Sequence, residues 1–155
     1  MQDTQVKIKR KSSAIKIHLV ANGRICACCG KKTPENLFLP GMCDAHTHGL
    51  RELGFTELQL VLDFSDEEIV GIMNTSPDMI MSGEVVEEDG AVINNLFTDG
   101  APVRLKAVKD DEGNDMFRLI ISDGKFCMPE DSKEYPYYLQ QASPYAKDYF
   151  KGAQA

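Results

Sequence analysis

The stretch "TELQLVLDFSDEEIVGIMN", residues 56–74, decides the fold, because a strand pattern gives way to a helix pattern within it. Its first half alternates leucine with other residues, which is the period of a β-strand. Ser65 and Glu68 then have the spacing of a capping box, and acidic residues fill the first predicted turn. An apolar stripe at helical spacing follows. The alternating residues are Leu58, Leu60 and Leu62, and the stripe consists of Ile69, Ile72 and Met73.

Alternating patterns also occur on both sides of this stretch. Residues 6–8 and 15–19 predict one or two N-terminal strands, and residues 83–108 read as short strands broken by Asp-Gly turns. "VRLKAV" (103–108) and "FRLIIS" (117–122) flank a polar loop, which predicts a β-hairpin. Residues 75–83 can continue or restart the helix, with Gly83 closing it.

These elements predict a single α+β domain, mostly antiparallel sheet with one main helix and an N-terminal zinc knuckle. Within residues 1–155 we expect a basic strand region and cysteine knuckle (1–38), an α+β core (39–125) and an irregular C-terminal tail that packs back (126–155). The tail is rich in Pro and Tyr, and we expect Tyr135, Tyr137 and Tyr138 to anchor it, with a short helix near 145–150.

Charge is distributed unevenly along the 155 residues, whose formal net charge is −7. Residues 1–32 contain eight Lys or Arg and one acid, whereas residues 33–155 contain nine against twenty-three acids. An acidic body does not favour broad contact with nucleic acid, because phosphate binding relies on Lys and Arg. The basic arm with Lys7, Lys9, Arg10 and Lys11 is either neutralised by the body or contacts nucleic acid or an acidic partner.

Localisation follows from the same composition. No run of apolar residues is long enough for a membrane span, and the N-terminal stretch lacks the apolar region of a secretory signal. We therefore expect a cytoplasmic protein of bacterial or phage origin, with no membrane partner. Its five cysteines should stay reduced there, which does not favour a disulfide framework.

The cysteine distribution predicts a structural zinc site. Cys26-x-x-Cys29, followed by Gly30, resembles the knuckle of zinc-ribbon proteins, and Cys43-x-x-His46 supplies a second pair thirteen residues on. We therefore predict Zn²⁺ held by Cys26, Cys29, Cys43 and His46. Two alternatives stay open: His48 replaces His46 as the fourth ligand, or Cys28 replaces a knuckle cysteine.

Other interpretations of the five cysteines are weaker. Cys26 and Cys29 could be ordinary buried thiols or a redox pair, but a redox Cys-x-x-Cys usually opens a helix, and "GKKTPEN" lacks a helical pattern. Cys127 lies far along the chain, and we expect it to be a buried core thiol.

The stretch "LPGMCDAHTHGL", residues 39–50, looks like the metal-binding first strand of amidohydrolases. Such sites belong to (β/α)8 barrels of about 200 residues or more, which this chain is too short to form. They also need further imidazoles, and no histidine follows His48. A small metal-dependent hydrolase using His46 and His48, with Asp44, Glu52 or Glu57 as base, remains an alternative.

From Leu39 to about Asp123 the chain resembles a bacterial family known as domain of unknown function 4262. The motifs are "AHTHGL" (45–50), "ELGFTELQLVL" (52–62), "IVGIMN" (69–74) and "SGEVVEEDGAV" (82–92). They are short and mostly apolar, and the region of resemblance, residues 39–123, is a little over half of the chain. The resemblance implies a small α+β domain and no particular reaction. Met73 stands where that family has Leu before Asn, a small departure from its pattern. His46 stands where the family frequently has an aromatic residue, and this substitution, together with Cys43, implies that the metal ligands belong to a subgroup.

These observations favour a non-enzymatic binding or regulatory domain with structural zinc, such as an inhibitor or immunity-type protein that covers a basic surface of a protein partner. The chain contains no Gly-rich phosphate loop and no serine nucleophile elbow. The alternatives are the hydrolase with His46 and His48, and nucleic-acid binding through the basic arm.

Overall fold

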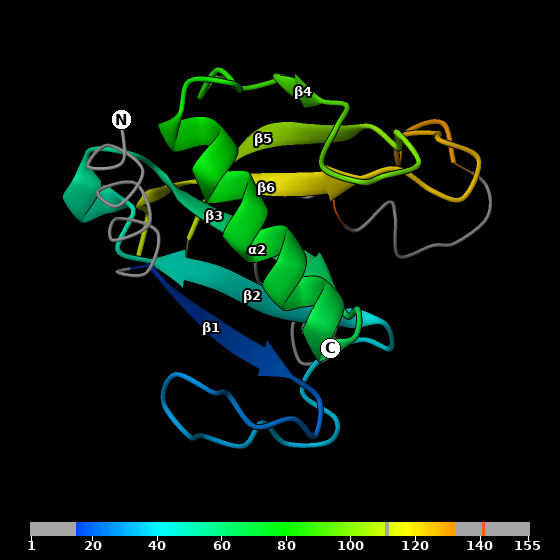
Figure 1. Cartoon of the computed structure of the whole chain (residues 1–155). Helices are drawn as coiled ribbons and strands as arrows, with labels where there is room; N and C mark the ends of the chain where they lie inside the picture. Colours follow the sequence, from blue (N-terminus) through cyan, green and yellow to red (C-terminus); the bar gives the residue numbers. More distant parts are fainter. Residues whose placement is uncertain (1–14, 111, 133–140, 142–155) are drawn as a thin grey trace.

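The structure is a computed structural model of the whole chain, and it describes residues 15–110, 112–132 and 141 (Figure 1). It confirms a single α+β domain with one mixed sheet and one main helix. The elements are β1 (Lys16–Ala21), β2 (Met42–His48), the 3-10 helix η1 (Arg51–Leu53), β3 (Glu57–Leu62), α2 (Asp66–Met81), β4 (Val92–Ile93), β5 (Val103–Lys109) and β6 (Asp115–Ile121).

The six strands form one sheet in the order β1-β2-β3-β6-β5-β4. All neighbouring pairs are antiparallel except β3 and β6, which run parallel in the centre of the sheet. Parallel neighbours need a crossover connection, and the segment that contains α2, β4 and β5 supplies it. The predicted hairpin of β5 and β6 is present, with Val103 opposite Ile121 and Lys109 opposite Asp115. The sheet therefore has β1 at one edge and the short β4 at the other.

Helix α2 begins where the capping box predicts. The Ser65 hydroxyl oxygen accepts the backbone N–H of Glu68 at 3.2 Å and donates to the Glu68 carboxylate at 2.9 Å. Residues 75–81 continue the helix, with Pro77 inside it, and Gly83 follows the C-cap with a φ of +82°. The open choice between continuation and restart is thus settled in favour of one helix.

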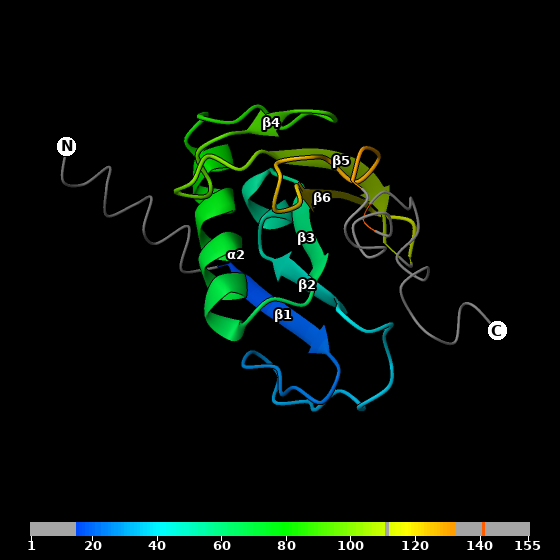
Figure 2. The same ribbon diagram turned by 90° about the vertical axis from the view of Figure 1, so that its right-hand side faces the viewer.

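Helix α2 packs on one face of the sheet, as the two views in Figures 1 and 2 show. Ile69 and Met73 of the helix share one buried apolar cluster with Leu58 and Leu60 of β3. Because strand side chains alternate between faces, residues between these leucines point to the opposite face. That second face carries polar groups, among them the fully buried Arg118 of β6.

Several features predicted from the sequence lie outside the described residues or differ in the structure. The strand at 6–8, the tyrosines of the tail and the helix near 145–150 lie outside the described residues. Between residues 83 and 102 the structure has one strand, β4, where the sequence predicts several short strands, because turns occupy most of this segment. Within the described part of the chain, no helix has both the length and the apolar character needed to cross a membrane.

Candidate metal centre

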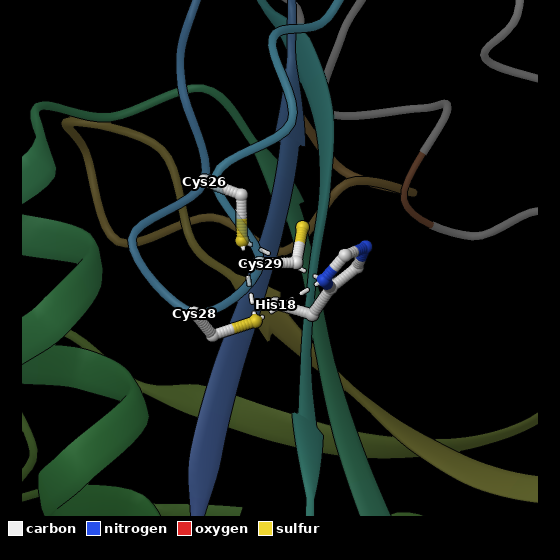
Figure 3. Close-up of side chains that lie close together, drawn as sticks. All are labelled: His18, Cys26, Cys28 and Cys29. Carbon is white, nitrogen blue, oxygen red and sulfur yellow. Dashed lines mark hydrogen bonds between the residues drawn. The ribbon is translucent and has the colours of Figure 1, made fainter.

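Four side chains that could ligate a metal ion meet beside the edge strand β1 (Figure 3). His18 comes from β1, and Cys26, Cys28 and Cys29 come from the turn that follows it. One ligand atom from each residue lies within 4.8 Å of every other. This group could hold a metal ion, and it is a three-cysteine, one-histidine set. We call it the knuckle cluster.

The local sequence folds the cysteine turn back toward β1. The backbone N–H of Cys26 donates to the carbonyl of Lys31 at 3.0 Å, and that of Gly30 donates to the carbonyl of Cys26 at 2.8 Å. Gly30 has a φ of +74°, in the left-handed region that a residue without a Cβ adopts at little cost. An isolated bridge between Ile25 and Lys32 closes the turn. The three thiols are therefore presented on a short, hydrogen-bonded segment.

Interatomic distances in the knuckle cluster match the size of a zinc site. The Cys26 and Cys28 Sγ atoms are 3.3 Å apart, and His18 Nδ1 lies 3.3 Å from Cys28 Sγ and 3.5 Å from Cys26 Sγ. Tetrahedral zinc with bonds of about 2.3 Å to sulfur and about 2.0 Å to nitrogen separates its ligands by about 3.5–3.8 Å. These three separations agree with the tetrahedral values within about half an ångström, and the separations that involve Cys29 are at most 4.8 Å, so small shifts would bring all four residues onto one ion.

Burial and hydrogen bonds shift the pKa values of Cys26 and Cys28 in opposite directions when no metal is bound. Burial raises the pKa of Cys26, but the hydrogen bond from the Leu19 backbone N–H, at 3.3 Å, and that from the Cys28 thiol outweigh it and bring the pKa to about 7. Burial and the hydrogen bond to Cys26 raise the pKa of Cys28 to about 11. Cys26 is thus the thiolate of the pair, and Cys28 is the thiol that donates to it.

His18 is suited to metal binding by its surroundings. Burial, followed by the imidazoles of His46 and His48, lowers the pKa of His18. The neutral imidazole that results is the form that coordinates a metal. Its ring centroid lies 5.1 Å from that of His46 and 5.7 Å from that of His48.

The structure brings together two of the four ligands predicted from sequence spacing. Cys26 and Cys29 belong to the knuckle cluster, whereas Cys43 and His46 do not. Cys43 is buried in β2, and its thiol donates to the carbonyls of Leu60 at 3.7 Å and Leu62 at 3.4 Å. Burial raises the pKa of the Cys43 thiol well above its usual range. The set of Cys26, Cys29, Cys43 and His46 therefore stays a prediction, and the group that the structure assembles is a different one.

Strand geometry explains why Cys43 and His46 separate. Residues three apart on a β-strand point to opposite faces, so this spacing suits a turn but not β2. Cys28, weighed as an alternative ligand, is present in the knuckle cluster. His18 was missed by the sequence analysis, and its only signal was its place on the strand that precedes the cysteine turn. Cys127, expected in the core, is half-buried and lies outside the apolar cluster.

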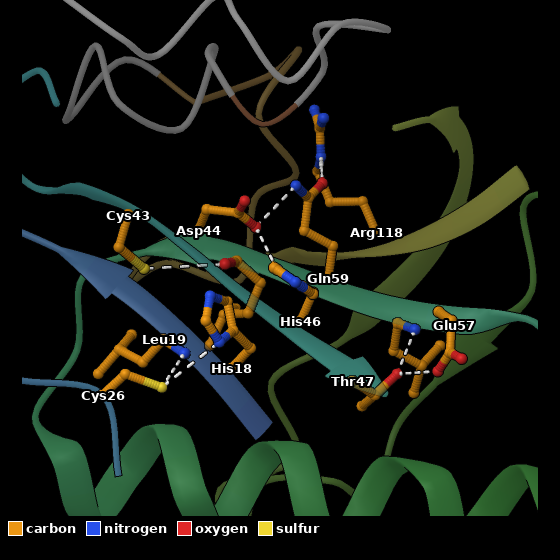
Figure 4. Close-up of polar contacts among 12 residues, drawn as sticks. His18, Leu19, Cys26, Cys43, Asp44, His46, Thr47, Glu57, Gln59 and Arg118 are labelled. Atoms are coloured by element: carbon orange, nitrogen blue, oxygen red, sulfur yellow. Dashed lines mark hydrogen bonds and ion pairs between the residues drawn. The ribbon is translucent and has the colours of Figure 1, made fainter. Parts of the chain in front are cut away.

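A row of polar side chains runs from the knuckle cluster across the second face of the sheet (Figure 4). In the strand register, His18 is paired with His46, His46 with Gln59, and Gln59 with Arg118. The Gln59 amide donates to Asp44 at 3.1 Å, and Arg118 Nε donates to the Gln59 carbonyl oxygen at 3.0 Å. These bonds tie Asp44 to the buried guanidinium of Arg118.

The row ends on the C-terminal side at Gln141. Arg118 Nη1 donates to the Gln141 backbone carbonyl at 2.8 Å. The Gln141 side chain accepts the Ile121 N–H at 2.8 Å and donates to the Ile121 carbonyl at 3.0 Å, as a neighbouring strand would. Gln141 therefore extends the hydrogen bonding of β6 and fixes Arg118 at the same time.

His46 and Asp44 form a hydrogen-bonded pair within this row. His46 Nδ1 and Asp44 Oδ1 are 3.1 Å apart. Burial lowers the pKa of His46, but the hydrogen bond to Asp44 outweighs it and raises the pKa overall. Burial raises the pKa of Asp44, but the hydrogen bonds from His46 and Gln59 lower it overall. Asp44 is thus a carboxylate that holds the imidazole in one orientation.

A cavity of about 350 Å³ opens beside this pair. His46, His48, Asp44, Glu52 and Glu57, the residues considered for a hydrolase, all line it. A metal site needs three or more His, Cys, Asp or Glu side chains close together. Among the described residues, however, the group that meets this condition is the knuckle cluster. The cavity is therefore a polar pocket next to the knuckle cluster.

Comparisons of the chain with protein-family models, curated proteins and solved structures find no match. The likeness to domain of unknown function 4262 therefore stays a resemblance of short motifs. Fold and site rest on the residues themselves.

Proposed function

We propose that the chain is a small zinc-binding α+β protein in which Zn²⁺, held by His18, Cys26, Cys28 and Cys29, has a structural role. The observation that carries the proposal is the convergence of four ligand atoms within 4.8 Å, next to a turn that is already closed by backbone hydrogen bonds. Thiolate and imidazole are the ligands that zinc prefers in structural sites.

The ligand count supports a structural rather than a catalytic ion. Structural zinc has four protein ligands in a tetrahedron, whereas catalytic zinc keeps one position for water or substrate. Three cysteines and one histidine fill the tetrahedron. Lys31 and Lys32 stand two and three residues after Cys29 and offset the negative charge of three thiolates.

The position of the ion gives it a mechanical role. It would join β1, through His18, to the turn that carries the cysteines. That turn is already hydrogen-bonded to the outer edge of β1, because Cys26 Sγ accepts the Leu19 N–H. Zinc would therefore hold the turn over an edge strand whose backbone would otherwise be free to pair with another chain.

Elemental analysis of purified protein tests the proposal, with one zinc per chain as the expected result. Cobalt substitution adds a spectroscopic test, because the charge-transfer bands report thiolate ligands. Cys28→Ser should lower the metal content and the thermal stability of the protein, whereas Cys127→Ser, outside the knuckle cluster, should leave both unchanged. A stable protein with no bound metal, or a Cys28→Ser variant with full zinc content and affinity, would refute the proposal.

A second pair of variants separates this ligand set from the one predicted by spacing. His18→Gln should weaken zinc binding strongly, and Cys43→Ala should keep one zinc per chain. The reverse pattern would favour Cys26, Cys29, Cys43 and His46. Cys43→Ala is the suitable control because it removes the thiol and leaves no new polar group in the core.

For the biological role we propose a non-enzymatic binding or regulatory domain, of inhibitor or immunity type, that recognises a protein partner. The filled ligand set and the acidic body, nine Lys or Arg against twenty-three acids over residues 33–155, support it. Replacing Zn²⁺ by Cd²⁺ should then preserve both fold and binding. If the protein were instead a metal-dependent hydrolase using His46 and His48, it would have a hydrolytic activity, and the replacement of Zn²⁺ by Cd²⁺ would change that activity.

Nucleic-acid binding by the arm stays a further alternative, and the arm lies outside the described residues. Binding that falls steeply with salt and is lost when Lys7, Lys9, Arg10 and Lys11 are changed to Ala would favour it.

A further inference from the structure

The polar cavity beside His46 has the properties of a ligand site that the metal proposal does not use. Its volume of about 350 Å³ lies within the range of small-molecule pockets. Strands β2 and β3 supply one wall, and the loop between β5 and β6 supplies another through Asp110, Glu112 and Asn114. The knuckle cluster is not part of its lining.

One side chain in the cavity is held in a fixed orientation. Asp44 and His46 both line the cavity, and the Asp44 carboxylate is hydrogen-bonded to His46 Nδ1. Asp44 is itself fixed by Gln59, and Gln59 by the buried Arg118. Because Nδ1 is engaged, Nε2 is the nitrogen left to contact a ligand. Such backing preorganises a binding group and lowers the ordering cost of binding.

The charge of the lining selects the kind of ligand. Five carboxylates line the cavity, against the single guanidinium of Arg51, so negative charge exceeds positive even with His46 protonated. Three of these carboxylates already accept hydrogen bonds within the protein: Asp44, Glu57 and Asp110. Glu52 and Glu112 are exposed, and no hydrogen bond or ion pair engages their carboxylates among the described residues.

We propose that this cavity binds a small organic cation that carries an ammonium group. The ammonium is placed between the carboxylates of Glu52 and Glu112, where it replaces water with charge-assisted hydrogen bonds. A second polar group of the ligand faces His46. The site is independent of the metal, so its failure would leave the zinc proposal intact.

The test uses three four-carbon probes that differ in charge: 1,4-diaminobutane, 1,4-butanediol and succinate. Each is titrated into the full-length protein as purified, in a buffer without amines, and followed by NMR. Diaminobutane should give saturable shifts at the His46 ring and the Asn114 amide at concentrations below about 10 mM. The diol and succinate should bind at least about fivefold more weakly.

Matched variants locate the binding. Glu112→Gln and Glu52→Gln should each weaken diaminobutane binding by about two- to fivefold, because each removes one partly exposed charge. Glu67→Gln makes the same change on the exposed first turn of α2, outside the cavity, and should have no effect. Absence of saturable shifts, equal binding of succinate, or an equal effect of Glu67→Gln would each overturn the proposal.

Discussion

The buried carboxylate of Glu57 organises the end of the His-x-His strand, and Glu57→Gln is the most informative single change to the fold. One carboxylate oxygen accepts the Thr47 hydroxyl at 2.8 Å and the Leu50 N–H at 3.2 Å. The other accepts the N–H groups of Gly49 at 3.3 Å and Arg51 at 3.1 Å. Helix η1 begins here without a side-chain cap of its own, so Glu57 serves as the acceptor for its first N–H groups.

Glutamine keeps one of these oxygens and replaces the other with an amide NH2. With the amide at the second oxygen, the backbone N–H groups of Gly49 and Arg51 would face a donor, and both would lose their partner in a partly buried site. A hydrogen bond to a charged group contributes about 1.5 kcal/mol or more, so two lost bonds cost about 3 kcal/mol. For a chain of this size that loss corresponds to a fall in melting temperature of roughly 6–12 °C.

Urea denaturation of wild type and variant measures the loss, provided the slope of the transition stays constant. Glu52→Gln, exposed on the same turn, is the control and should change stability by less than about 0.5 kcal/mol. A double-mutant cycle with Thr47→Val should be clearly non-additive, since the two side chains are directly bonded. A Glu57→Gln variant less than about 1 kcal/mol below wild type would refute the reasoning.

Four further predictions follow from other parts of the molecule. Removing zinc with a chelator should lower the melting temperature by roughly 8–16 °C in calorimetry, because free zinc at about 1,000 times its Kd contributes about 4 kcal/mol. Gly30→Ala should weaken zinc binding by about five- to thirtyfold in a competition titration, because a φ of +74° costs a residue with a Cβ about 1–2 kcal/mol. Ser65→Ala removes the cap of α2 and should cost about 1 kcal/mol in urea denaturation. The hydrogen bond from Arg104 lowers the pKa of Glu130 from 4.5 to about 2, so the pair stabilises the fold above pH 4.5 and loses this effect as the pH falls toward 2. Both side chains are partly exposed, so Glu130→Gln should cost less than about 1 kcal/mol at pH 7, and this difference should vanish in acid.

Local patterns predicted several elements of this fold, because the causes of those elements lie within a few residues of each other. The capping box at Ser65 and the leucine alternation before it each specify one element, and the hairpin of β5 and β6 needs only neighbouring residues. The parallel pairing of β3 with β6 depends on contacts between segments about sixty residues apart, and no short pattern encodes it. The role of Gln141 as a partner of β6 is equally non-local.

The candidate metal site shows the same difference between local and distant causes. The Cys-x-x-Cys spacing identified the turn, and Gly30 indicated how it closes. The second half of the site required knowledge of which strand lies beside the turn. Spacing pointed forward to Cys43 and His46, whereas the chain turns back to the strand it has just left and meets His18. A ligand search by spacing alone therefore favours the downstream pair, even where β-strand geometry sends its two members to opposite faces.

The two edges of the sheet differ in the backbone that they leave open, and this difference bears on the proposed zinc site at β1. At the far edge, β4 is only two residues long and offers little backbone for pairing with another chain. Strand β1 has six residues and is the only long edge strand within the described part of the chain. On its outer side the Leu19 N–H is taken by Cys26, and the Ala21 carbonyl accepts the N–H of Arg24. Both partners lie in or beside the cysteine turn, so whatever fixes that turn also closes the edge. Zinc at the knuckle cluster would thus protect the sheet from edge-to-edge association, and its loss would affect solubility as well as stability.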